Sequence, residues 1–182
     1  IEINSSNNNT IEGNWIGLNA AGTAASANAE RGIYASASTG LLIGGTSAAS
    51  RNVIAGNAQM GIYFDDVDAS VISGNYVGTN AAGTGDVNGA VADTAKSGVF
   101  LTNGSSGNTI GGLTDGARNV LSGNNHFGFE VLFGSQNNLL QGNYIGTDAT
   151  GLVALGNING GAVFWNAGTG NVFGGGAAGA GN

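Results

Sequence analysis

Few side chains in this sequence could carry acid–base or metal chemistry, and they form only one dense cluster. Asp65, Asp66 and Asp68 follow the β-prone run Gly61-Ile62-Tyr63-Phe64. Hydrolysis of a glycosidic bond needs two carboxyl groups about 5–10 Å apart, and carboxylates also bind calcium. Asp is equally common in solvated turns. We therefore interpret Asp65 and Asp66 first as turn residues, and keep a calcium or catalytic site as the alternative.

The basic side chains offer no partner for a catalytic carboxylate. The chain has only 4 Lys and Arg residues and a single His. Arg51 and Arg118 precede the same dipeptide, Asn-Val, in two similar segments, which predicts a repeated structural role such as hydrogen bonding to loop carbonyls. His126 lies in an expected loop, and general acid–base catalysis there is not favoured. Cys is absent, and we expect no catalytic site, no bound metal, no cofactor and no enzyme activity.

Composition restricts the partners that this chain can have. The net charge is −7 and only 8% of residues are charged, compared with about 25% in average proteins. Nucleic acids and anionic membranes both require clustered cations, so neither is an expected partner. No apolar run reaches the roughly 18 residues that a membrane-spanning helix needs, and no signal peptide is visible. The hydrophobic residues, 41% of the chain, occur in strand-sized clusters, which argues against disorder.

Short β-prone segments that end in Gly-Asn recur along the chain. The stretch Asn52-Val53-Ile54-Ala55-Gly56-Asn57 returns as Asn119-Val120-Leu121-Ser122-Gly123-Asn124, and looser copies end at Asn14, Asn75 and Asn143. A further strand-like run begins at a glycine in each repeat, at Gly32, Gly61, Gly98, Gly128 and Gly161. A unit of about thirty residues with three short strands is typical of a solenoid.

A solenoid satisfies the physical demands of these short strands. No circuit can bury its apolar face alone, so circuits stack and share one core. We predict an all-β, right-handed parallel β-helix of about five three-strand circuits, because crossovers between parallel strands are right-handed in about 98% of cases. Alternation along each strand places an equivalent residue of successive circuits inward: Ile33, Ile62, Val99, Phe129 and Ala162. Extra residues between Gly83 and Gly98 predict a lengthened loop within Asp86–Ser97.

The Gly-Asn endings have a structural explanation. Asn tolerates left-handed backbone angles at a sharp bend. Stacked Asn amides also hydrogen-bond from one strand layer to the next, as they do in cross-β stacks. We therefore predict a ladder of Asn side chains along the axis, formed by Asn14, Asn57, Asn75, Asn124 and Asn143.

The repeats resemble those of a known fold family. The elements Asn-x-Ile-x-Gly-Asn-Tyr-Ile-Gly-Thr, Asn-Val-Ile-x-Gly-Asn, Gly-Ile-x-Ile and Asn-Thr-Ile-Gly-Gly are similar to the right-handed parallel β-helix repeats of pectin-lyase-like proteins. They most resemble the Gly/Asn-rich repeats of very large bacterial surface or secreted proteins, over nearly the whole chain. The resemblance implies the fold. Members of that superfamily include polysaccharide lyases, hydrolases and epimerases as well as adhesins, tailspikes and stalks, so the fold does not select an activity.

We expect any binding function to lie on the outer surface. Tyr34, Tyr63 and Phe100 occupy outward positions of consecutive circuits, and we call them the aromatic stripe. A stripe of this kind stacks on sugar rings or contacts a protein, or it packs across strands and stabilises the sheet. Together with Asp65 and Asp66 it forms the candidate ligand-binding set.

The expected role is structural and adhesive. We expect residues 1–182 to form a single β-helix domain, an internal part of a longer, large extracellular or cell-surface bacterial protein. The alternative is a carbohydrate-binding or polysaccharide-processing β-helix that uses the aromatic stripe. Expected partners are a glycan or a protein surface. A second copy is also an expected partner, associating head to tail, because uncapped solenoid ends and open strand edges recruit further strands.

Overall fold

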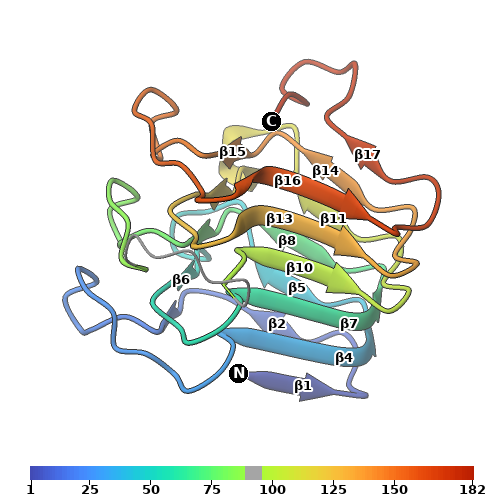
Figure 1. The fold of residues 1–182 in the computed structure, drawn as a ribbon, viewed down its shortest axis with the longest axis horizontal. Helices are drawn as coiled ribbons and strands as arrows, with labels where there is room; N and C mark the ends of the chain where they lie inside the picture. The colour runs from blue at the N-terminus through green and yellow to red at the C-terminus, as the bar shows by residue number, and fades with distance from the viewer. Residues whose placement is uncertain (89–95) are drawn as a thin grey trace.

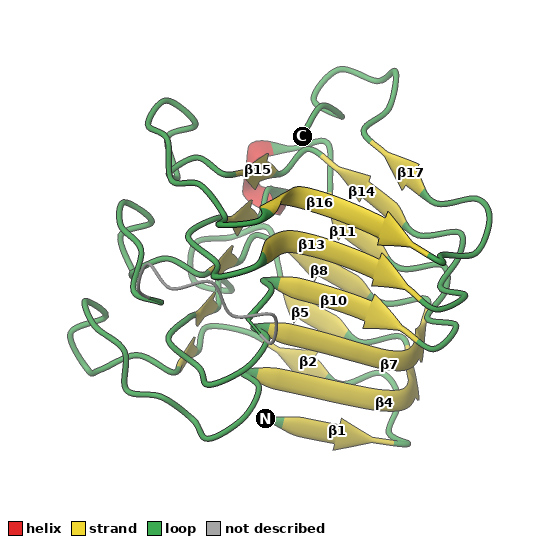
Figure 2. Ribbon diagram, in the orientation of Figure 1, coloured by secondary structure: helices red, strands yellow, loops and turns green. Residues whose placement is uncertain are grey.

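Three parallel sheets, named A, B and C, form almost all of the regular structure. The computed structural model describes residues 1–88 and 96–182. Every pairing between neighbouring strands in these sheets is parallel. Figure 2 shows strands joined by loops, with one short 3-10 helix, η1 (Asp115–Ala117). Within the described ranges, no helix has the length and apolar character needed to cross a membrane.

Each sheet takes one strand from successive turns of the chain. Sheet A contains β1 (Glu2–Asn4), β4 (Ile33–Thr39), β7 (Ile62–Asp68), β10 (Val99–Thr102), β13 (Phe127–Leu132) and β16 (Gly160–Trp165). Sheet B contains β2 (Thr10–Ile11), β5 (Leu42–Gly44), β8 (Val71–Ser73), β11 (Thr109–Gly111), β14 (Leu139–Gln141) and β17 (Val172–Phe173). Sheet C contains β3 (Trp15–Ile16), β6 (Val53–Ile54), β9 (Tyr76–Val77), β12 (Val120–Leu121) and β15 (Tyr144–Ile145).

The chain contributes one strand to sheet A, then one to sheet B and one to sheet C, before it returns to sheet A. We call each such passage a circuit and number the circuits from the one that begins with β1. Figure 1 shows the chain running along sheet A in front, returning behind it through sheet B, and rising from β1 to β16, which is a right-handed path. Among the described residues, five circuits hold all three strands and a sixth contributes β16 and β17. The predicted parallel β-helix of about five three-strand circuits is confirmed.

The core is a column of side chains enclosed by the three sheets. Strand registers align Ile33, Ile62, Val99 and Phe129 at one inward position, and none of them is more than 1% exposed. Ala162 aligns with Phe129 and packs against the core, so the inward set predicted from the sequence is confirmed. Sheets B and C add further buried columns, among them Ile43, Ile72, Ile110 and Leu140, and Ile54, Val77 and Leu121.

A left-handed bend recurs along sheet A. Equivalent residues with φ between 44° and 58° form it in successive circuits: Ala37, Asp66, Asn103, Phe133 and Asn166. In β7 the pairing continues past the bend, because Val67 is buried and pairs with Ser38. The acidic cluster from Asp65 to Asp68 therefore lies within β7, which corrects the prediction that it follows the strand.

Two ladders of Asn carboxamides run up the corners of the stack. In the B–C ladder, at the corner between sheets B and C, each Nδ2 donates to the Oδ1 of the next member at 2.9–3.1 Å. Its members are Asn14, Asn52, Asn75, Asn119, Asn143 and Asn182. In the A–B ladder, at the corner between sheets A and B, Asn108 donates to Asn138 and Asn138 donates to Asn171, both at 3.0 Å.

The residues predicted to form one ladder are divided between two corners. The B–C ladder takes three of them, Asn14, Asn75 and Asn143. Asn57 and Asn124 lie at the corner between sheets C and A, where Asn28 donates to Asn57 at 2.8 Å and Asn124 donates to Asn157 at 2.9 Å. The reason is that Gly-Asn follows a sheet B strand in odd-numbered circuits but a sheet C strand in even-numbered ones.

Every second circuit carries a protruding turn between sheets C and A. These turn loops, residues 18–25, 79–86 and 147–154, are each closed by an antiparallel bridge. They form a column of their own, because Ala81 N–H donates to the Gly22 carbonyl and Ala149 N–H donates to the Gly83 carbonyl, both at 2.9 Å. An aromatic ring of the same circuit packs against the glycine of each turn loop: Trp15, Tyr76 and Tyr144.

Replacing Asn119 by Ala should destabilise the protein strongly. Asn119 is fully buried, and its Oδ1 accepts the backbone N–H and Nδ2 of Asn75 at 2.9 and 3.1 Å. Loss of these acceptors should lower the free energy of unfolding by at least about 2 kcal/mol, measured by urea unfolding. Asn14→Ala is the control, because no donor in the described part of the chain reaches Asn14 Oδ1, and it should cost less than about 1 kcal/mol. Equal losses would contradict the ladder's role.

Gly74 and Gly107 separate the effect of close packing from that of backbone conformation. Both have left-handed φ, +69° and +64°. A Cβ on Gly74 would overlap the carbonyl oxygens of Gly45 and Gly116, whereas the atom nearest to a Cβ on Gly107 is the Ala69 nitrogen at 3.9 Å. Gly107→Ala should lower the free energy of unfolding by about 1–2 kcal/mol, the conformational penalty alone. Gly74→Ala should lower it by at least about 2 kcal/mol more, because the new Cβ also overlaps backbone atoms. Calorimetry tests this order, and two equally stable variants would refute it.

Candidate functional site

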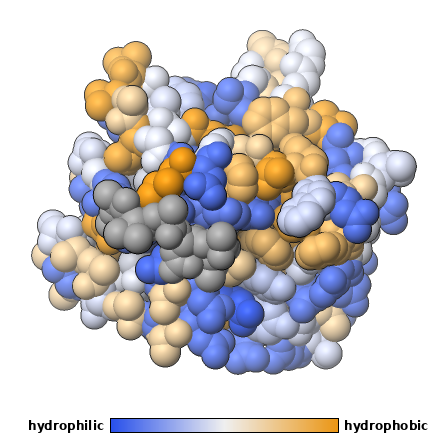
Figure 3. Space-filling model, viewed as in Figure 1, coloured by the Kyte–Doolittle hydropathy of each residue, from blue (hydrophilic) through white to orange (hydrophobic). Residues whose placement is uncertain are grey.

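The outer face of sheet A carries the candidate binding residues. Strand registers place one outward side chain of each circuit in a single row: Glu2, Tyr34, Tyr63, Phe100, Glu130 and Val163. The aromatic stripe therefore occupies three consecutive circuits in the middle of this row. Figure 3 views the molecule from the same side and shows hydrophobic surface gathered toward the upper, C-terminal circuits, with more hydrophilic surface below them.

The rings of the stripe pack against one another. Tyr63 and Phe100 are stacked, with ring centroids 4.9 Å apart and planes 10° apart, and Tyr34 is tilted by 49° at 5.4 Å from Tyr63. The Arg31 guanidinium lies 4.8 Å from the Tyr34 centroid and 4.6 Å from that of Tyr63, which is a cation–π arrangement. Protein groups thus occupy both sides of the Tyr63 ring, and a ligand would meet ring edges rather than open faces.

The carboxylates beside the stripe differ in their surroundings. Asp65 accepts hydrogen bonds from the Tyr34 hydroxyl at 3.2 Å and from an Asn side chain of the next circuit at 2.8 Å. Asp68 accepts from the backbone N–H and the hydroxyl of Ser106, both at 2.8 Å. Asp66 is exposed at the left-handed bend and, with Asp68, lines a recess of about 260 Å³. Asp65 is therefore held by protein donors, whereas Asp66 is open to solvent.

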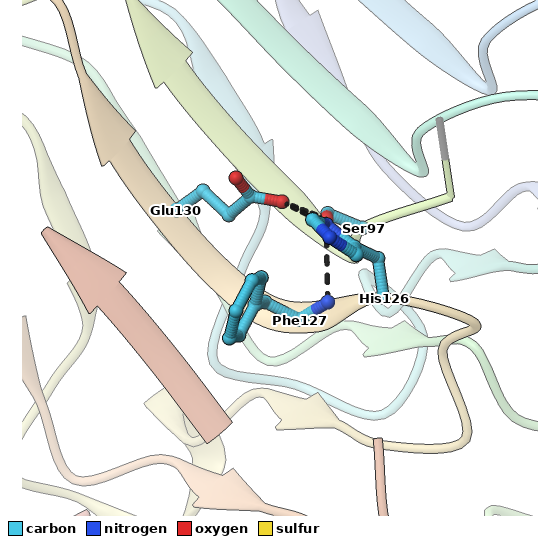
Figure 4. Close-up of polar contacts among 4 residues, drawn as sticks. All are labelled: Ser97, His126, Phe127 and Glu130. Carbon is cyan, nitrogen blue, oxygen red and sulfur yellow. Dashed lines mark hydrogen bonds and ion pairs between the residues drawn. The ribbon is translucent and has the colours of Figure 1, made fainter. Parts of the chain in front are cut away.

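A polar cluster that sequence analysis did not identify lies next to the stripe. Glu130 occupies the outward position beside Phe100, yet its side chain is only 6% exposed. As Figure 4 shows, His126 Nδ1 lies 2.7 Å from Glu130 Oε1, and the Ser97 hydroxyl donates to the same oxygen. Ser97 Oγ also lies 3.1 Å from His126 Nδ1. These contacts supply partners to a carboxylate whose burial would otherwise be costly.

The geometry of this cluster differs from that of a nucleophilic triad. In a triad the hydroxyl and the carboxylate contact opposite nitrogens of the imidazole. Here Ser97 and Glu130 both approach Nδ1 of His126, so the carboxylate does not orient the ring toward the hydroxyl. We interpret the three residues as a buried hydrogen-bond network. Two signals could have indicated it: the strand register places Glu130 beside Phe100, and the spacing of four residues places His126 and Glu130 on one face of an extended segment.

The equivalent arginines of the two similar segments have the structural role that the sequence predicts. Arg51 Nε and Arg118 Nε each donate to a glycine carbonyl in the next circuit at 3.1 Å. Each guanidinium also stacks on a tyrosine ring, Arg51 on Tyr76 at 4.1 Å and Arg118 on Tyr144 at 4.3 Å. The predicted bonding to carbonyls is confirmed, and both side chains stabilise contacts between circuits.

Metal ligands and the lengthened loop add little to the site. Within residues 1–88 and 96–182, no group of three His, Cys, Asp or Glu side chains is placed to hold a metal ion. The loop predicted within Asp86–Ser97 falls largely outside the described residues, which omit 89–95. At the N-terminal end of this loop, Asn88 Nδ2 donates to the Gly123 carbonyl at 2.9 Å. This end of the loop is therefore attached to the next circuit.

Comparison with known proteins does not assign a function to this surface. No family model, no curated protein and no solved structure matches the chain. The interpretation of the outer face of sheet A therefore depends on the contacts described above.

Tyr63 should titrate at higher pH than an ordinary tyrosine. Burial of the hydroxyl is the largest cause and raises the pKa of Tyr63. The negative charge of Asp65 raises this pKa further, whereas the positive charge of Arg31 lowers it. Asp65→Asn should therefore lower the pKa of Tyr63, and Arg31→Leu should raise it. Ultraviolet difference spectroscopy during alkaline titration measures both changes, with Tyr63→Phe identifying the transition. Two variants that leave the pKa of Tyr63 unchanged would contradict this assignment.

The same shift predicts a dependence of stability on pH. Above about pH 10 the unfolded chain loses the tyrosine proton before the folded protein does, so stability falls as pH rises through the folded pKa. Tyr63→Phe should remove this part of the alkaline decline. Urea unfolding at a series of alkaline pH values tests it, and identical slopes for the wild type and the variant would count against it.

Proposed function

We propose that this chain is a structural and adhesive segment of a large extracellular or cell-surface bacterial protein, built from pectin-lyase-like β-helix repeats. The role is a stiff rod that displays contact residues on its outer surface. The observation that carries the proposal is the B–C ladder, which joins all six circuits from Asn14 to Asn182 without a break. A stack joined in this way resists bending between circuits.

The contacts within the candidate site also support a scaffold role. Asp65 is engaged by a tyrosine hydroxyl and an amide, and Glu130 by Ser97 and His126. Carboxylates held in this way by protein donors stabilise their own circuits. The proposed surface contacts are a glycan or protein partner bound outside the aromatic stripe, and head-to-tail association of two chains through their open repeat edges.

The alternative is a β-helix that binds or processes carbohydrate. The aromatic stripe beside Asp65 and Asp66 favours it, because sugars are commonly bound by aromatic rings next to polar side chains. The stacking of Tyr63 on Phe100 weakens it, since a sugar ring needs an open aromatic face. A ligand on this surface would instead be held by ring edges, hydroxyl groups and Asp66.

Glycan binding and turnover by the purified chain distinguish these two functions. Under the scaffold proposal, Tyr63→Ala combined with Asp66→Ala should leave glycan-array binding unchanged, and no acidic or neutral polysaccharide should be shortened. The control is Asp115→Ala, which removes a carboxylate that is 93% exposed, pairs with Arg118 and lies in η1 between sheets B and C rather than on sheet A. Loss of a glycan signal in the double variant alone would favour the alternative. Release of new polysaccharide ends by the wild-type chain would overturn the scaffold proposal.

A further inference from the structure

We infer that the corner between sheets A and B carries a binding site for a neutral glycan. The site is formed by Asn103, Phe133, Trp165 and Asn166, which we call the corner patch. This inference rests on the proposed display of contact residues and identifies one set of them together with its partner. In Figure 1 the corner lies beyond the arrowheads of β10, β13 and β16, and Asn103, Phe133 and Asn166 are each the first residue after one of these strands.

Phe133 is the exceptional member of the left-handed bend. Its φ is 46°, in a region that a bulky residue rarely adopts. Asn and Asp tolerate this region, and Asp66, Asn103 and Asn166 occupy it in other circuits. Backbone outliers of this kind cluster at ligand-binding sites. Packing in the core does not account for this one, because Phe133 is 50% exposed.

The exposure of Phe133 is a property of the corner and not of an end of the stack. Gly104 N–H, in circuit four, donates to the Phe133 carbonyl at 3.1 Å. Gly134 N–H donates to the Asn166 carbonyl, in circuit six, at 2.9 Å. A bend of another circuit therefore lies on each side of Phe133, and its side chain is still half exposed between them.

Trp165 supplies the second ring on the flank of the rod. Its neighbour Phe164 pairs with the buried Val131, so alternation along β16 directs Phe164 inward and Trp165 outward. An outward ring lies on the flank whether or not further circuits follow β16. Its centroid is 6.4 Å from that of Phe133, with the ring planes tilted by 41°. The two rings therefore do not stack, and Trp165 is 67% exposed.

The faces of these two rings are open, in contrast to those of the aromatic stripe. Phe100 is stacked on the Tyr63 ring at 4.9 Å, and the Arg31 guanidinium lies 4.6 Å from the Tyr63 centroid. Every cation–π contact among the described residues is made with a tyrosine ring, so none covers Phe133 or Trp165. A sugar ring needs an open aromatic face, and the corner patch offers two.

Two amides next to the rings keep unused hydrogen-bonding groups. Asn103 Nδ2 donates to Asp65 at 2.8 Å, and no donor in the described part of the chain reaches Asn103 Oδ1. The Asn166 side chain bonds to none of the described residues, and only its carbonyl is engaged. Each amide lies one strand spacing, about 4.8 Å, from Phe133 along the axis. A carboxamide both donates and accepts, as binding of sugar hydroxyl groups requires.

The charges around the patch select a neutral ligand. Asp148 is the only Asp, Glu, Lys or Arg after Glu130, so circuits five and six supply no Lys or Arg to a carboxylated sugar. The cations of circuit four lie at the other corners, Lys96 before β10 and Arg118 between sheets B and C. Asp65, bonded to an amide of the patch, repels an anionic ligand.

The size of the patch favours a sugar over a protein. A fully covered aromatic side chain buries about 150–250 Å², so two rings that are half to two-thirds exposed offer roughly 150–300 Å². A stable protein interface buries about 800 Å² on each partner. The smaller area matches one or two sugar rings.

Phe133→Asn tests the site, because Asn already occupies the bends on both sides. The probes are neutral oligosaccharides of glucose, mannose and N-acetylglucosamine, with oligogalacturonate as the acidic comparison. By isothermal titration calorimetry, the wild type should bind at least one neutral probe and not oligogalacturonate. Phe133→Asn and Trp165→Ala should each bind that probe at least about tenfold more weakly, which corresponds to about 1.4 kcal/mol.

Matched variants separate binding from folding. Phe133→Asn should unfold at the same or a higher urea concentration than the wild type, because the bend no longer holds a bulky residue. Phe133→Tyr keeps a ring and should keep binding. Leu113→Asn makes a matching change at a residue that is 48% exposed and lies between sheets B and C, and it should bind as the wild type does. Trp15→Phe leaves Trp165 as the single tryptophan, and its fluorescence should change when the neutral probe binds.

Other outcomes would overturn the inference. They are a wild type that binds no neutral probe or binds oligogalacturonate equally well, and a Phe133→Asn variant that binds normally or unfolds at a lower urea concentration. A glycoprotein retained equally before and after enzymatic removal of its glycans would indicate a protein partner instead. Absence of glycan binding leaves the scaffold proposal standing. Release of new polysaccharide ends would overturn that proposal without changing the binding result.

Discussion

Each inner carboxamide of the B–C ladder joins three successive circuits, and the rest of the structure depends on that connection. Asn119 accepts from Asn75 below it, donates to Asn143 above it at 2.9 Å, and donates to the Ile72 carbonyl at 2.8 Å. The chain turns sharply at this corner, where backbone groups would otherwise be buried without partners. Because a carboxamide offers its donor and acceptor in fixed directions, the ladder also sets the register. Strands of only two or three residues can then pair stably in sheets B and C.

The fold follows from the sequence because the repeat encodes it locally. Alternation within each short strand is enough to identify the inward column from Ile33 to Ala162. The ladder was harder to assign, because similarity of sequence is not equivalence in the structure. Gly13-Asn14 resembles Gly56-Asn57, yet Asn14 bonds to Asn52. Circuits that are similar in sequence lie two apart in the stack, whereas the hydrogen bonds of the ladder join neighbouring circuits. Neighbouring circuits place the Gly-Asn motif at different corners.

The candidate site was less predictable for a related reason. Outward positions such as Tyr63 and Phe100 follow from alternation, but the way their rings meet depends on distances between circuits. Arg31 lies against the rings of two tyrosines although it is in the connection before β4, and nothing in its local sequence indicates this contact. Glu130 is bonded by His126, four residues before it, and by Ser97, which reaches it from the preceding circuit. Contacts of this kind can be predicted only when the strand register between circuits of unequal length is known.

Stacking leaves a small part of the surface free to vary. Inward positions are fixed by the core, corners by Asn and Gly, and even the outward Tyr63 has neighbours on both sides of its ring. The turn loops are different, since their tips make few contacts with the stack. Thr23, Thr84 and Leu152 occupy equivalent positions in the three loops, and Leu152 is 88% exposed. A substitution there alters the surface without breaking a ladder bond or a core contact. The residues that hold the stack together are therefore separate from those at the loop tips, so the loop surface can change while the stack is kept.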